Sequence, residues 1–109
     1  MSNVIFANAY KLKEGSSVQE FLLTVERLYN YNLTKHKGFI SLTIYNDGDA
    51  WGDAGVFETQ DDLDAFLEIA STNTNEFSEA FYSFLDFNND FHIPDEDIFK
   101  MPIIREWYK

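Results

Sequence analysis

A chain of 109 residues, of which 45% are hydrophobic and 17% aromatic, is long enough for one folded domain and too short for two. Its formal net charge of −11, from 19 acidic and 8 basic residues, argues against nucleic acids and anionic membranes as partners, because both bind basic surfaces. The chain has no cysteine, no signal-like segment and no long apolar run, so we expect a single cytoplasmic domain over residues 1–109.

The first predicted strand runs from about Val4 to Lys13, and its alternation places Asn8 on the same face as Phe6 and Tyr10. Strands disfavour Asn, and an apolar face tolerates it only when its amide is hydrogen-bonded. The amide of Asn8 is therefore expected to meet either the protein's own backbone or a ligand.

The first predicted helix follows Gly15, since Ser17 and Glu20 have the spacing of a capping box and apolar residues then recur at helical intervals. A second strand begins after Gly38. One of its faces is predicted to hold Phe39, Ser41, Thr43 and Tyr45, and the other Ile40, Leu42 and Ile44.

The dipeptide Asp47-Gly48 predicts a hairpin that leads into an antiparallel third strand at about Ala50 to Glu58. Two helical segments are predicted next. Thr59 and Asp62 are the expected caps of the first, and Asn73 and Glu76 those of the second. The end of the chain, "IIREWYK", reads as a last strand.

This order of elements predicts an α+β fold of the ferredoxin-like split βαβ type, with a four-stranded antiparallel sheet in which the last strand neighbours the first. Two helical segments cover only one face of such a sheet. A second copy of the chain is the simplest cover for the other face, and we therefore expect a homodimer.

Three segments, "NAYKLKEGSSVQEF", "KGFISLTIYND" and "GVFETQDDLDAF", resemble the antibiotic-biosynthesis-monooxygenase type of dimeric α+β barrel, a family related to the small haem-degrading monooxygenases. The resemblance extends from Val4 to Tyr108. Its motifs are an Asn in the first strand seven residues before a Gly, a "GF" that opens the second strand, and an acidic-capped segment that runs into the second helix.

The resemblance implies a catalytic role for Asn8, which matches an Asn that faces a pocket between the sheet and the second helical region in that family. It implies a cofactor-independent monooxygenase that oxidises a quinol-like or polycyclic phenolic molecule with dioxygen. In that reaction the phenol is deprotonated, its anion reacts with dioxygen, and an amide stabilises the developing oxyanion. Neither a metal nor a flavin is needed.

A haem-binding or haem-degrading protein is the first alternative. In the haem-degrading branch the second helix carries a Trp and the next one a His that ligates iron, and the resemblance places Phe66 and Phe81 at those positions, with Tyr82 adjacent. Because Phe has no lone pair for iron, the usual His ligand is missing. The second alternative is a non-enzymatic dimeric module that binds a small apolar or aromatic ligand.

Aromatic residues at helical spacing are commonly core residues, but a pocket that they line favours a planar apolar ligand. Trp107, on the last strand, is a further candidate for this pocket, with core or dimer packing as its alternative. The predicted substrate-binding residues are Phe66, Phe77, Phe81, Tyr82 and Trp107.

No general base is assigned from the sequence. Histidine is a common general base, but His36 and His92 fall in loops expected to be solvated. Tyrosines that can hydrogen-bond a phenol are Tyr10, Tyr45 and Tyr82. The loop residues Asp86, Asn88, Asp90 and Asp97 have the spacing of a calcium loop, but Phe91 occupies the position that requires Gly, so no metal site is predicted.

Overall fold

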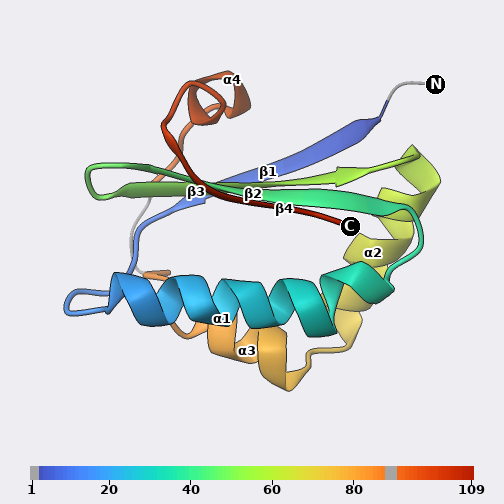
Figure 1. The fold of residues 1–109 in the computed structure, drawn as a ribbon, viewed down its shortest axis with the longest axis horizontal. Helices are drawn as coiled ribbons and strands as arrows, with labels where there is room; N and C mark the ends of the chain where they lie inside the picture. Colours follow the sequence, from blue (N-terminus) through green and yellow to red (C-terminus); the bar gives the residue numbers. More distant parts are fainter. Residues whose placement is uncertain (1–2, 88–90) are drawn as a thin grey trace.

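The computed structural model describes residues 3–87 and 91–109, which form a four-stranded antiparallel sheet with α1 and α3 below it and α4 above it (Figure 1). The strands are β1 (Val4–Tyr10), β2 (Phe39–Asp47), β3 (Ala50–Phe57) and β4 (Ile103–Tyr108). The helices are α1 (Val18–Tyr31), the 3-10 turn η1 (Leu33–Lys35), α2 (Gln60–Thr72), α3 (Glu76–Tyr82) and α4 (Asp95–Ile98). The predicted α+β order of elements is confirmed.

The strand order is β1-β3-β2-β4, so the prediction that the last strand neighbours the first is wrong. β4 pairs with β2, where Trp107 lies opposite Leu42. The reason lies in α4, which follows α3 in the chain but lies on the opposite face of the sheet (Figure 1). There its residue Ile98 packs with Ala54 and Tyr45, and the chain continues to the free edge of β2.

Two helices begin at the predicted caps. The side-chain oxygen of Ser17 accepts a hydrogen bond from the Glu20 N–H at 3.2 Å, and that of Thr59 accepts one from the Asp62 N–H at 3.1 Å. Each bond satisfies one of the N–H groups that a helix leaves without a partner at its start.

The third helix begins at Asn75 and not, as predicted, at Asn73. The Asn75 side chain accepts hydrogen bonds from the N–H groups of Phe77 and Ser78, and the Ser78 hydroxyl accepts one from the Asn75 N–H. Asn73 ends α2 instead, because its N–H donates to the Ile69 carbonyl. The reciprocal bonds between Asn75 and Ser78 decide where α3 starts.

A register shift in β2 changes one predicted face. Between Phe39 and Ser41 the pairing with β3 is irregular, so that Phe39 lies opposite Phe57. The ring of Phe39 therefore packs on the helix side of the sheet, 5.8 Å from the Tyr29 ring, and does not share a face with Ser41. β1 is also shorter than predicted, ending at Tyr10.

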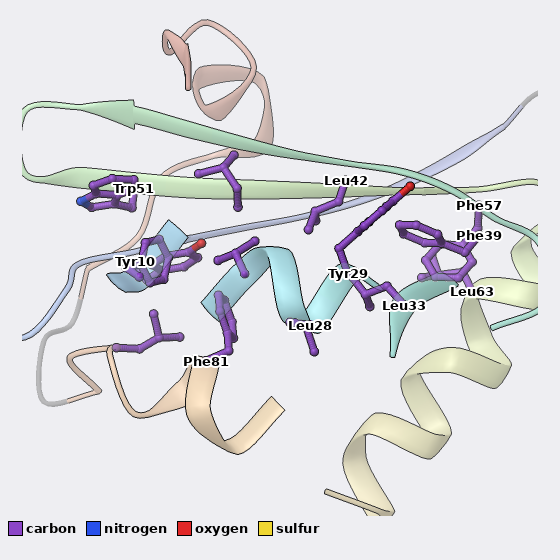
Figure 2. Packing of buried hydrophobic residues seen from close by; sticks show 14 residues of the cluster. Tyr10, Leu28, Tyr29, Leu33, Phe39, Leu42, Trp51, Phe57, Leu63 and Phe81 are labelled. Carbon is purple, nitrogen blue, oxygen red and sulfur yellow. The ribbon is translucent and has the colours of Figure 1, made fainter. Parts of the chain in front are cut away.

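The main core lies between the sheet and the helices (Figure 2). The side chains of Phe21 and Val25 on α1 are completely buried. Burial of each such side chain contributes about 1.5–3 kcal/mol to stability. Figure 2 shows Tyr10 and Trp51 toward one end of this cluster and Phe39, Phe57 and Leu63 toward the other, so the buried layer runs along the strands.

A smaller cluster lies beneath α4, on the other face of the sheet. A Cβ atom at Gly52 would come within 2.9 Å of the Ile98 side chain, so the glycine lets α4 approach the sheet closely. The helix covers only part of this face, because Ile5, Ile103 and Tyr108 stay exposed. No helix among residues 3–87 and 91–109 has the length and apolar character needed to cross a bilayer.

Candidate functional site

A cavity of about 540 Å³ lies between the sheet and helices α2 and α3, with α1 and η1 completing its wall. A cavity of this size is in the range that holds small organic molecules. Most of its lining is apolar. The large apolar side chains among its lining residues include Phe6, Leu28, Leu42, Phe57, Phe66, Leu67 and Phe81.

Asn8 and Asp53 form the polar centre of this wall. β1 pairs with β3 so that Asn8 lies directly opposite Asp53, and both residues line the cavity. The Asn8 Nδ2 donates a hydrogen bond to Asp53 Oδ1 at 3.3 Å. The Asn8 amide thus meets a carboxylate and not the backbone, and its second N–H hydrogen remains for another acceptor.

Burial raises the pKa of the Asp53 carboxyl from 3.8 to about 6, while hydrogen bonds from Tyr10 and Asn8 act in the opposite direction. The part of Asp53 that is not buried lies where the residue lines the cavity. No salt bridge to Asp53 is formed within the part of the chain that the structure describes. A carboxylate with a pKa close to neutrality has the property required of a general base.

Tyr10 lies beside Asp53 and stays protonated. Its pKa is raised well above 10.0, first by burial and then by the charge and hydrogen bonding of Asp53. The hydroxyl is buried and has no hydrogen-bond partner of standard geometry among the described residues, so Asp53 acts on it mainly through its charge. Its ring is held edge-on against Phe81, with centroids 5.9 Å apart, so this neutral phenol is held firmly next to the carboxylate.

The structure brings four of the predicted site residues together. Asn8 reaches the cavity from β1, Phe66 from α2, and Phe81 and Tyr82 from α3. These are the sheet and the second helical region between which the resemblance places a pocket.

Phe77 and Trp107, also predicted as substrate-binding residues, are not among the described residues that line this cavity. Phe77 stacks on Tyr31 with ring centroids 5.2 Å apart, because it lies on the side of α3 that faces α1. Trp107 stacks on Tyr29 at 6.0 Å, because β4 pairs with β2 and so lies far from β1 in the sheet.

His36 differs from its predicted place in a solvated loop. It is half-buried and lines the cavity, with its ring edge-on to Phe66 at a centroid distance of 4.8 Å. Burial lowers the pKa of this histidine, which favours the neutral imidazole. His92 is exposed and is not among the residues that line the cavity.

Asp53 is the site residue that the sequence did not reveal. The available signal was an acidic residue in the middle of "AWGDAGVF", since strands are poor in Asp. Its role depends on the residue that lies opposite it in the neighbouring strand. Because its hydrogen bond to Asn8 joins positions 45 residues apart, the sequence pattern around Asp53 does not show this partner.

The lining lacks the His that the resemblance expects as iron ligand, because Phe81 stands at that position, and Asp53 would repel the propionates of haem. His36 and Tyr82 are other lining residues with an atom that can ligate iron. Lys11 is the only Lys or Arg among the described lining residues, and its ammonium lies 3.3 Å from a carboxylate oxygen of Asp49. Among the described residues no three His, Cys, Asp or Glu side chains gather as a metal site, while Asn88 and Asp90 of the proposed calcium spacing lie outside them.

In comparisons with protein-family models, curated proteins and solved structures, no significant match to this chain was found.

Proposed function

We propose that this protein is a cofactor-independent monooxygenase that oxidises a quinol-like or polycyclic phenolic molecule with dioxygen. The observation that carries the proposal is the hydrogen-bonded pair of Asn8 and Asp53 on the wall of an apolar cavity. The resemblance to antibiotic-biosynthesis monooxygenases supports it. The position of Asn8 also supports it, because Asn8 lines a cavity that lies between the sheet and the second helical region.

In the proposed reaction Asp53 is the general base. Its carboxylate takes the proton of the substrate, and the apolar walls contact the rings of the resulting anion. The free N–H of Asn8 donates to the oxygen of that anion and so stabilises the charge as it forms.

The electron-rich ring carbon of the anion then adds to dioxygen, which forms a carbon–oxygen bond and a peroxide. Protonated Asp53 returns its proton to the peroxide. Loss of the remaining hydrogen on the same carbon breaks the oxygen–oxygen bond and releases water. The reacting carbon, which is a CH₂ group in the keto tautomer of the phenol, thus becomes a carbonyl group, and dioxygen supplies the oxygen of that carbonyl and of the water. The substrate supplies all the electrons.

We also propose a homodimer formed through the sheet face that α4 leaves partly open. Side chains on this side of the sheet are apolar and exposed, with exposed fractions of 52% for Ile5, 52% for Ile103 and 67% for Tyr108. Exposed apolar groups on one face of a sheet favour association.

Dioxygen consumption with a panel of hydroquinones and anthrones tests the proposal. We expect turnover by the protein and loss of turnover in Asn8→Ala and Asp53→Asn. Asp64→Asn is the matched control, because Asp64 is an exposed carboxylate on α2 that does not line the cavity. Equal turnover in all four proteins would contradict the assigned roles.

Two further measurements separate the alternatives. Saturable binding of panel compounds without dioxygen consumption would favour the non-enzymatic ligand-binding module. Titration with hemin is expected to give no saturable Soret shift, and such a shift would favour the haem alternative.

A further inference from the structure

The charges along the cavity wall are unbalanced. Asp53 is acidic, and no salt bridge to it forms among the described residues. The basic side chain of Lys11 is partly neutralised by Asp49, and His36 is favoured in its neutral form by burial. The protein as a whole carries a formal net charge of −11. A ligand inside this cavity therefore meets a negative potential.

The lining of the cavity extends along β3. From Asp53 to Phe57 the chain advances four residues along β3, which spans about 13 Å at the usual rise of a strand. Phe57 contacts Phe66 at a centroid distance of 5.2 Å, and Phe66 in turn contacts His36, so aromatic rings continue the wall beyond the polar pair. The length suits about three linearly fused rings.

We propose that the cavity selects uncharged, elongated ring systems over anionic ones, and that Asp53 makes this selection. The hydroxyl of the ligand binds at Asn8 and Asp53, and its rings extend along β3 toward Phe57 and Phe66. A carboxylate next to that hydroxyl is rejected because it is brought beside the Asp53 carboxylate in an environment of low dielectric constant. The substrate class is thus a neutral fused-ring phenol that lacks a carboxylate beside its hydroxyl.

This inference deepens the proposed function, on which it rests for the identity of the substrate as a phenol. It is tested by binding in the absence of dioxygen. Discrimination by charge without dioxygen consumption would therefore contradict the proposed oxygenase activity but not the proposed charge selection.

The test compares 3-hydroxy-2-naphthoate with its methyl ester, which has the same rings and hydroxyl but no charge. Dissociation constants are measured anaerobically by tryptophan fluorescence at slightly alkaline pH, where Asp53 is ionised. We expect the ester to bind about 30-fold more tightly than the acid, which corresponds to two like charges about 8 Å apart at an effective dielectric constant of about 20.

Asp53→Asn is expected to reduce this preference to a few-fold, while Asp64→Asn keeps it in full. Asn8→Ala retains the Asp53 charge and is also expected to keep the preference, even if both ligands bind more weakly. Circular dichroism establishes that each variant is folded. The proposal is overturned if the wild-type protein binds acid and ester equally, if Asp53→Asn keeps the full preference, or if Asn8→Ala loses it.

Discussion

Asp53 is an acidic residue in an environment that disfavours its charge. In the folded protein its pKa is about 6, compared with a usual value of 3.8, because burial penalises the carboxylate. Between these two pH values the folded state holds this proton while the unfolded state has released it. The contribution of Asp53 to stability is therefore highest at acidic pH and is lost as the pH rises through about 6.

Asp53→Asn should accordingly stabilise the protein at neutral pH. The difference between pKa values of about 6 and 3.8 corresponds to at most about 3 kcal/mol, and water in the cavity reduces it. Urea unfolding at neutral pH and near pH 4 measures the effect, which should be much smaller at the lower pH. Asp64→Asn is the control. A gain that does not depend on pH would contradict an Asp53 pKa raised by burial.

The rate of dioxygen consumption should follow the ionisation of Asp53. Because the carboxylate and not the carboxyl group accepts the substrate proton, the rate is expected to rise as the pH passes about 6. Replacement of the base in Asp53→Asn should lower the rate by about 10²–10⁴-fold. Loss of the amide donor in Asn8→Ala should lower it by about 10²–10³-fold.

Initial rates across the pH range, corrected for spontaneous oxidation of the same phenol, provide the measurement. The Asp64→Asn variant should reproduce the wild-type profile. If the rate of the wild-type protein did not change with pH around pH 6, the assignment of Asp53 as the general base would be contradicted.

At the scale of elements, the short helix α3 matters because it carries Phe81 and Tyr82 to the cavity. With only 7 residues the helix has few internal hydrogen bonds, so its reciprocal cap is a large part of what holds it. The wall formed by α3 thus depends on a side chain, Asn75, that precedes it.

Asn75→Ala should therefore destabilise the protein by about 1 kcal/mol, the usual effect of losing an N-cap. Asn73→Ala should have a smaller effect, because Asn73 closes α2 through its backbone N–H, which alanine retains. Chemical unfolding of the two variants gives the comparison, and weaker ligand binding by Asn75→Ala would report the change at the cavity. If Asn73→Ala lowered the stability more than Asn75→Ala, the role of Asn75 as the N-cap of α3 would be contradicted.

At the scale of the whole molecule, the two faces of the sheet are covered unequally. One face carries α1, α2 and α3, whereas the other has only α4 over part of its area (Figure 1). The apolar side chains left exposed on this side belong to the edge strands β1 and β4, whose outer edges are unpaired in the sheet.

We expect light scattering to give the mass of a dimer at micromolar concentration. Ile103→Lys places a charge on this surface at an exposed position, and it should shift the mass toward the monomer without unfolding the chain. A charge at an exposed apolar position outside that surface, as in Leu23→Lys on α1, should leave the mass unchanged. A wild-type mass of one chain would contradict the dimeric barrel.

Much of the fold follows from local sequence. The order of the strands and of helices α1, α2 and α3, and the caps at Ser17 and Thr59, depend on residues only a few positions apart, which is why they were predicted correctly. The short helix α4 was not predicted. The start of α3 was missed because Asn73 and Asn75 are both suitable caps, and the choice rests on the bond between Asn75 and Ser78.

The sequence by itself determined that Asn8 stands on an apolar strand face and needs a partner. Only the tertiary structure decided that the partner is Asp53, because the β1–β3 register joins residues far apart in the chain. In the same way, α4 crosses the open face of the sheet, and β4 then pairs with β2, which keeps Trp107 out of the cavity. Local preferences select elements, whereas long-range packing selects which of their side chains meet.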